Sequence, residues 1–320
     1  MGFFETILAP FRWLVSWIMF MFHEGFTFLG MPPASGWTWV LSIVGLVVVI
    51  RAALIPVFVK QIKAQRGMQA LQPDLRKLQQ KYKGKTDQLS RQAMTQEQMA
   101  LYKKHGTNPF AACLPILIQM PFFFALFTVL NGISRASAEG DTIGALSPES
   151  VRQFDNATIF GAPLSSTFLG SFGENMNISV IILSLVMIIA MTSSQFITQK
   201  QIMAKNMSDE AMQSPFMRQQ KIMLYILPLV FGIGGINFPI GVLVYWTTTN
   251  VWTMAQQFYV IRKMPTPGSP AAKALAERRA KKGLPMVPLL GERKTEPAVE
   301  TAPEPRVQRV QPQRKKRKKR

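Results

Sequence analysis

Apolar blocks alternate with charged stretches along this chain of 320 residues. The longest uncharged block, from Ile222 to Ile261, would form a helix of about 60 Å, twice the bilayer hydrocarbon thickness of about 30 Å. It must therefore fold back once, and Asn237-Phe238-Pro239 is the predicted turn. The pattern predicts an all-α polytopic membrane protein with five transmembrane helices, at about 37–59, 108–131, 177–197, 222–237 and 239–261.

The segment between the first two spans, 60–107, predicts a helical hairpin, because Met68, Leu71, Leu75 and Leu78 recur at helical spacing. This apolar stripe either packs the two arms of the hairpin against each other or forms a surface that binds varied apolar segments of other chains (clients), to which flexible methionines adapt. Methionines recur in the second loop of this kind, 198–221. The candidate client contacts are Met68, Met94, Met99, Met203 and Met207.

The first 34 residues are apolar and aromatic from residue 6 to 22, but Pro10 and Arg12 interrupt them. There is no basic segment or small-residue cleavage site of the kind that a signal peptide needs. We expect residues 1–34 to form an amphipathic helix on the outer membrane surface, with Phe and Trp at the interface. A membrane span is the alternative. The topology of the rest of the chain does not decide between the two, because a span here would only place the N-terminus inside.

The formal net charge of +20 is unevenly distributed and predicts the orientation. The hairpin segment 60–107 holds eleven Lys and Arg against three acids, whereas the loop 132–176 holds two against five. Positive residues stay on the cytoplasmic side, so the hairpin, the loop 198–221 and the C-terminus are expected in the cytosol. The loop 132–176 is expected outside, in the bacterial plasma membrane.

The C-terminal part, 263–320, is rich in Pro, Ala, Glu and basic residues and is expected to be a disordered cytosolic tail. Like-charge runs of this kind bind polyanions, and both anionic lipids and ribosomal RNA qualify. An anchor that only fixes orientation explains the charge equally well. The polyanion-binding residues would be Arg314, Lys315, Lys316, Arg317, Lys318, Lys319 and Arg320.

Arg51 is the most informative residue, because it lies inside a predicted span and none of the five spans contains an Asp or Glu. Placing an arginine side chain at membrane depth costs about 3 to more than 10 kcal/mol of free energy, so it needs either a hydrated cavity or an acidic group from another molecule. Polar side chains in the cytosolic halves of other spans predict a groove open to the cytosol, although helix contacts could explain any one of them. The predicted groove residues are Arg51, Gln119, Thr192, Gln195, Trp246, Asn250 and Thr253.

Four segments resemble the YidC family of membrane protein insertases: IRAALIPVFVKQ, MQALQPDLRKLQQKY, ALYKKHGTNPFAACLPILIQMPFFFALF and PIGVLVYWTTTNVWTMAQQ. The resemblance runs from about residue 36 to 262. It implies five core transmembrane helices around a cytosol-open hydrophilic groove, an external amphipathic helix and a cytosolic hairpin. It also implies that Arg51 engages the polar or acidic segment of a client, with Gln119, Gln195 and Trp246 beside it.

The resemblance further implies nascent membrane proteins as clients and the general secretion translocon as a partner. A large external domain is not apparent between the spans, which favours the Gram-positive or actinobacterial form of the family.

The sequence thus predicts an insertase and chaperone for newly made membrane proteins, without covalent chemistry. No nucleotide motif or metal cluster is found, and no cofactor is expected. One alternative is a small-solute transporter, although coupled transporters usually place Asp, Glu or His within their spans. A second alternative is an intramembrane enzyme, but the possible nucleophiles Ser193, Ser194 and Cys113 have no His or Asp partner within a span. A third is a ribosome-docking membrane protein without insertase action.

Overall fold

The computed structural model of the protein describes residues 3–106, 108, 114–172, 176–207 and 215–285. Helices account for most of these residues, and the predicted all-α polytopic fold class is confirmed. The helices are α1 Phe3–Phe28, α2 Gly36–Ala53, α3 Ile55–Ala70, α4 Gln72–Lys81, α5 Gln88–Lys104, α6 Leu114–Glu139, α7 Pro148–Asn156, α8 Ile178–Asn206, α10 Pro215–Gly235, α11 Ile240–Lys263 and α12 Pro270–Ala280. The short elements are the paired strands β1 Thr158–Ile159 and β2 Ala162–Pro163, and the 3₁₀ helix η2 Leu169–Ser171.

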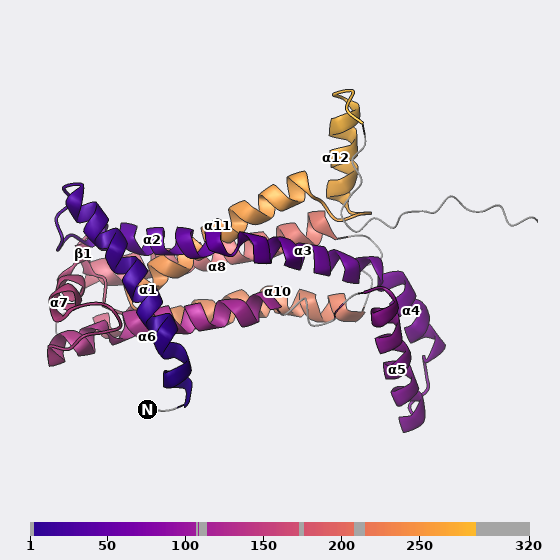
Figure 1. Ribbon diagram of the computed structural model, residues 1–320, viewed down its shortest axis with the longest axis horizontal. Coiled ribbons are helices and arrows are strands. Elements are labelled where there is room, and N and C mark those ends of the chain that lie inside the picture. Colours follow the sequence, from indigo (N-terminus) through magenta and orange to yellow (C-terminus); the bar gives the residue numbers. More distant parts are fainter. Residues whose placement is uncertain (1–2, 107, 109–113, 173–175, 208–214, 286–320) are drawn as a thin grey trace, which may run out of the picture.

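The long helices α2, α3, α6, α8, α10 and α11 run along one common axis as a bundle (Figure 1). Helix α8 packs against α10 and α11, and α11 also packs against α2. Helix α7 and the β1–β2 hairpin lie at one end of the bundle, whereas the α4–α5 hairpin and α12 lie at the other (Figure 1). The two loop regions of opposite charge are thus at opposite ends.

Helices α2 and α3 continue one another across a short break at Leu54, just before Pro56. Proline lacks an amide hydrogen, and its ring clashes with the carbonyl group four residues earlier, here that of Ala52, which accounts for the break. The amides of Leu54 and Phe58 still bond to the carbonyl oxygens of Ile50 and Leu54, at 3.1 and 2.9 Å. The predicted first span therefore corresponds to α2 and the first turn of α3.

Within the part of the chain that the structure describes, four helical segments are long and apolar enough to cross a membrane by themselves: Glu5–Phe28, Gly36–Ala53, Leu117–Glu139 and Ile178–Asn206. This set differs from the five predicted spans, because it includes α1 and lacks α10 and α11. The apolar part of α10, Leu224–Gly235, is shorter, and the Thr, Asn and Gln residues of α11 lower its mean hydropathy. Both helices nevertheless pack against α8 in the bundle, where α10 runs along it and α11 crosses it obliquely (Figure 1).

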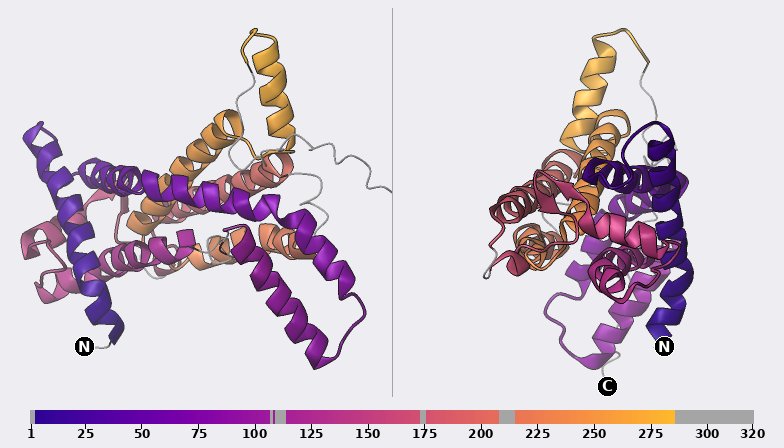
Figure 2. Two further views of the ribbon diagram at one scale, coloured as in Figure 1. Left: turned by 45° about the vertical axis from the view of Figure 1, so that its right-hand side comes forward. Right: turned by 90° about the vertical axis from the view of Figure 1, so that its left-hand side faces the viewer.

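Helix α1 lies across the bundle instead of along it. Figure 2 shows this in both views, most clearly in the right-hand one, where the other helices are seen end-on and α1 runs along one side of them. Its inner side packs against α2 and α6, with Val15 and Met19 fully buried. Its other side exposes Trp13, Trp17 and Met21, which are spaced four residues apart and so form one stripe.

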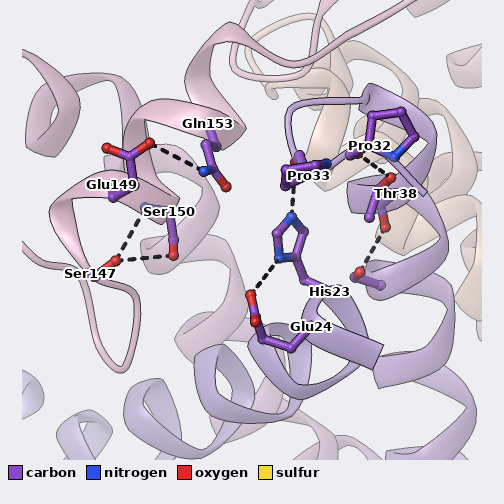
Figure 3. A network of polar contacts seen from close by, with 10 residues as sticks. His23, Glu24, Pro32, Pro33, Thr38, Ser147, Glu149, Ser150 and Gln153 are labelled. Carbon is purple, nitrogen blue, oxygen red and sulfur yellow. Dashed lines mark hydrogen bonds and ion pairs between the residues drawn. The ribbon is translucent and has the colours of Figure 1, made fainter. Parts of the chain in front are cut away.

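The main hydrophobic core joins α1, α2, α6, α7 and α11 at the end of the bundle that carries α7. Trp39 of α2 is fully buried there between the ring of His23, whose centroid is 3.9 Å away, and that of Phe154, at 5.2 Å. His23 is held by polar contacts of its two ring nitrogens with the Glu24 carboxylate and the Pro33 carbonyl oxygen (Figure 3). These contacts tie α1, the loop after it and α2 into one unit.

The described part of segment 132–176, which the sequence predicts only as an external loop, is folded. Ser147 caps α7 by accepting the amide hydrogen of Ser150 (Figure 3). The β1–β2 hairpin packs against the start of α2, where Gly36 lies so close to the carbonyl group of Thr158 that no side chain fits. The segment thus contributes Phe154, Leu164 and other residues to the main core.

At the opposite end, α4 and α5 form an antiparallel pair with a small core of Leu71, Leu75 and Tyr102. The Glu97 carboxylate accepts hydrogen bonds from Lys81 Nζ, at 2.6 Å, and from the Tyr82 hydroxyl, at 2.8 Å. These contacts close the pair near its tip.

The expectation of a disordered tail from residue 263 is wrong for its first part, because Pro270–Ala280 form helix α12. Ser269 is fully buried and caps this helix by accepting the amide hydrogen of Ala272, and Pro270 occupies the first turn, where its missing amide hydrogen costs nothing. Residues 286–320, which include the basic run at 314–320, lie outside the described residues.

Candidate functional site: a polar region below the packed core

The packing of three central helices changes at one depth of the bundle. In α2 the last buried residue is Ile50, and in the described part of α6 the first is Ala125. In α11 a buried run from Ile240 to Tyr245 is followed by half-buried or exposed residues up to Val260. The end that carries α7 is therefore tightly packed, and the part toward the α4–α5 hairpin is loosely packed.

Arg51 is the first residue of α2 beyond the buried run and is half-buried. No carboxylate of the described residues forms an ion pair with its guanidinium group. Tyr245 of α11 lies close enough to interact with Arg51 electrostatically. The Tyr245 hydroxyl in turn accepts a hydrogen bond of 3.3 Å from Gln119 Nε2 of α6. Gln119 and Tyr245 thus form a polar pair between α6 and α11, with Arg51 of α2 near it.

Other predicted groove residues form a second group, between α8 and α11. Asn250 Nδ2 donates a hydrogen bond of 3.1 Å to the Met191 carbonyl oxygen. Thr192 Oγ1 and Gln195 Oε1 are buried and have no hydrogen-bond partner in the part of the chain that the structure describes. Among the described residues, no hydrogen bond or ion pair joins this group to Arg51. Buried polar atoms without partners are costly, so water in this region would stabilise them.

The Trp246 side chain is half-buried in an aromatic cluster between α6, α10 and α11. Its ring centroid lies 4.9 Å from that of Phe123, 4.8 Å from Phe231 and 5.6 Å from Phe238. Thr253 donates its hydroxyl to the Thr249 carbonyl oxygen in its own helix. These two predicted residues are thus engaged in packing and in a local hydrogen bond.

The predicted methionine contacts fall into two classes. Met68 packs on the core of the α4–α5 pair, and Met203 and Met207 pack with Leu224, so these three are structural contacts. Met99 of α5 is 44% exposed, whereas Met94 is half-buried. The polyanion-binding residues 314–320 lie outside the described residues.

Sequence reasoning missed Tyr245 as a site residue. Its position directly before Trp246 in a span was visible, but tyrosines are common in spans, and the proximity of its hydroxyl to Arg51 depends on how α2 and α11 pack. The outer core was also missed, since no residue pattern indicated that segment 132–176 folds onto the bundle.

The family model described as "60Kd inner membrane protein" matches residues 31–267 of this chain. A protein from Streptomyces avermitilis named "Membrane protein insertase YidC" is 48% identical over 285 residues, which cover 87% of this chain and 64% of that protein. The chain belongs to the YidC family of membrane protein insertases. Relatives of the same name are 41% identical over 282 residues in Tropheryma whipplei strain Twist and 37% identical over 327 residues in Bifidobacterium longum.

These two alignments cover 86% and 99% of this chain, and 90% and 96% of the respective YidC relatives. The family resemblance predicted from the four sequence segments is confirmed, and the relatives include actinobacterial proteins. Together with its apolar helices, membership of the YidC family makes this chain a multi-pass bacterial membrane protein.

Proposed function

We propose that this protein inserts newly made membrane proteins by admitting the polar segment of a client into a hydrated groove beside Arg51. The observation that supports this most strongly is the position of Arg51. It follows directly on the last buried residue of α2, and no acid of the described residues pairs with it. A cation in this position costs least when water reaches it and is stabilised further by a visiting carboxylate.

The direction of opening follows from the packing and the charges. The loosely packed part of α2, α6 and α11 faces the α4–α5 hairpin, whose segment carries most of the basic residues between spans. Because positive residues stay on the cytoplasmic side, we place this end and the C-terminus in the cytosol. The main core at the other end then separates the groove from the outside.

The proposed five spans are α2 with the start of α3, α6, α8, α10 and α11. Helix α1 is apolar enough to span, but it lies across the bundle (Figure 2), which supports its assignment to the outer membrane surface. Its exposed stripe of Trp13, Trp17 and Met21 would then contact lipid.

Insertion in this scheme needs no covalent step. The apolar segment of the client moves along α8 and α11 into lipid, while its polar segment stays hydrated and bound beside Arg51. Burial of about 20 apolar residues drives the first movement. The membrane potential contributes about 2.3 kcal/mol per elementary charge for each 100 mV to movement of a charge across the bilayer.

The partners proposed here are nascent membrane proteins, the ribosome, the general secretion translocon and anionic lipids. Nascent clients follow from membership of the family. The other three rest on the basic C-terminal part or on the resemblance of the sequence.

The test replaces Arg51 by Ala and by Lys and measures insertion into proteoliposomes by protease protection. The client is a single-span protein whose translocated segment is either acidic or, with Asn and Gln in place of Asp and Glu, neutral. Arg51→Ala should reduce insertion of the acidic client at least about tenfold, which corresponds to about 1.4 kcal/mol, and should reduce that of the neutral client less. Arg51→Lys should retain most of the activity, because it keeps the charge.

The matched control is Arg135→Ala. Arg135 is an exposed arginine of α6 at the opposite end, where it pairs with Glu139, and its loss should change neither client. Equal loss for Arg51→Ala and Arg51→Lys would indicate bidentate recognition in place of simple charge. No loss for either would exclude the groove from the mechanism.

A further inference from the structure

Helix α12 has an orientation that its composition alone does not explain. It stands crosswise to the bundle in Figure 1, and it is seen from the side in the right-hand view of Figure 2, where the bundle is viewed end-on. If the bundle crosses the membrane, α12 must therefore lie parallel to the membrane plane. It does so at the end that carries the basic α4–α5 hairpin.

This orientation is fixed by specific contacts with the bundle. The amide of Thr266, just before α12, donates a hydrogen bond of 2.9 Å to Asn206 Oδ1 at the end of α8. Arg278 Nη2 donates one of 3.1 Å to the Arg262 carbonyl oxygen in the last turn of α11. A cation at the C-terminus of a helix is favourable because the last carbonyl groups lack partners. The helix is thus attached at its start and again near its end.

The charges of α12 and its C-terminal turn, 270–282, are strongly unbalanced. Glu277 is the one acidic residue in this range, against five basic residues: Lys273, Arg278, Arg279, Lys281 and Lys282. Lys273, Lys281 and Lys282 are exposed and form no ion pair with any described carboxylate. Arg262 and Lys263 add two charges in the last turn of α11.

The distance to the lipid surface is short enough for these charges to act. The apolar run of α8 ends at Ile197, and Asn206 lies nine residues further, or about 13 Å along the helix. The headgroup region occupies about 5–7 Å of this on each side of a bilayer. About 6–8 Å is left, which is comparable to the Debye length of about 8 Å at physiological ionic strength, and the stems of lysine can bridge part of it.

We propose that α12 is a docking helix for anionic lipid headgroups on the cytosolic membrane surface, with Lys273, Lys281 and Lys282 as its principal contacts. This rests on the orientation given under the proposed function. The rule that positive residues stay inside accounts for basic residues here, but not for a capped helix that lies flat and is attached to two spans. The consequence is a local enrichment of anionic lipid beside the cytosolic ends of α8 and α11, where clients would enter the bilayer.

The test uses the full chain in nanodiscs, with Cys113→Ser and Ala280→Cys to attach one fluorophore to exposed residue 280. Quenching by nitroxide-labelled headgroups reports how close α12 is to the lipid surface. Quenching should be stronger in discs that contain phosphatidylglycerol than in purely phosphatidylcholine discs. It should return to the neutral level in high salt, where the Debye length is about 3–4 Å.

The triple variant Lys273→Gln, Lys281→Gln, Lys282→Gln should lose this difference between the two lipids. Each basic residue near an anionic surface strengthens binding by a factor of about five, so three neutralisations are sufficient to remove it. The variant keeps Ser269 and Arg278, and hydrogen exchange of the α12 amides checks that the helix persists. The matched control removes as many charges from the hairpin segment and should keep the difference: Lys83→Gln, Lys103→Gln, Lys104→Gln.

Equal quenching in both lipids would overturn the proposal, as would a lipid difference that vanishes when the chain is cut after Pro285, since the tail would then be the binding element. A response of the fluorophore to ribosomal RNA in neutral discs, without one to anionic lipid, would identify α12 as a nucleic-acid surface instead. These measurements need no client and do not involve Arg51. Failure here is therefore distinguishable from failure of the proposed groove.

Discussion

The outer core can be tested through a pair of residues that fill one space, Phe154 of α7 and Gly241 of α11. Phe154 is fully buried, and its ring centroid lies 5.2 Å from that of Trp39. A Cβ atom added to Gly241 would lie 3.0 Å from Phe154 Cζ, which is tighter than ordinary contact. The two positions therefore share a volume that can be occupied from either side.

Phe154→Ala should lower the free energy of unfolding by about 3–5 kcal/mol, the usual cost of truncating a fully buried phenylalanine. Gly241→Ala should cost about 1–3 kcal/mol by overpacking, offset by up to about 1 kcal/mol from the better helix propensity of alanine. In the Phe154→Ala background the added methyl group no longer meets the phenyl ring, and its remaining contact, 3.5 Å from the Leu164 carbonyl oxygen, is an ordinary one. We therefore expect Gly241→Ala to be neutral or stabilising there, with a coupling of about 1–2 kcal/mol between the two changes.

The assay is reversible unfolding by sodium dodecyl sulfate in mixed micelles, followed by circular dichroism. The control is Phe124→Ala, which truncates a phenylalanine of α6 that is 41% exposed and should cost clearly less than Phe154→Ala. Costs for the two single variants that simply add in the double variant would refute the shared volume. In that case the packing of α7 against the start of α11 is not as described.

Two further predictions concern the ends of the molecule. Glu97→Gln should increase hydrogen exchange at the tip of the α4–α5 pair, because it weakens the contacts with Lys81 and Tyr82. These two contacts, of which the one with Lys81 has the larger effect, lower the pKa of Glu97. The carboxylate therefore stabilises the pair fully above the ordinary carboxyl range, and this stabilisation is lost as the pH falls through the lowered pKa of the folded state. Hydrogen exchange measured from pH 7 downward should show this loss in the native chain and none in the variant. Gly144→Ala should lower the thermal stability, since Gly144 has a φ of 61° and an added Cβ would collide with Ser16 of α1; an unchanged melting temperature would contradict that contact.

Much of the helical framework could be predicted because long apolar blocks leave little choice. The fold-back before Pro239 lies between the ends of α10 and α11 in the structure. Helix α12 escaped prediction because the basic composition of the tail as a whole favours disorder. The local signal at its start, Ser269 followed by Pro270, was present but short.

The candidate site was predictable residue by residue but not as an arrangement. The polarity of Arg51, Gln119 and Asn250 within apolar blocks is a property of the sequence. Which of them meet depends on helix rotation and packing, and the structure divides them into two groups. For the same reason Trp246, selected as a groove residue, packs among aromatic rings.

The division of the bundle into a packed and a loosely packed part gives the proposed groove a physical purpose. The buried run of α2 extends from its start at Gly36 to Ile50, which is about 21 Å of helix against a hydrocarbon thickness of about 30 Å. A polar segment that reaches Arg51 through water has therefore already passed about a third of the apolar barrier. The cost of crossing falls with the thickness that is left, while the pull of the membrane potential acts across that same shortened layer. In the proposed mechanism, a core that is tight on one side of Arg51 and loosely packed on the other provides both effects while the outer end of the bundle stays closed.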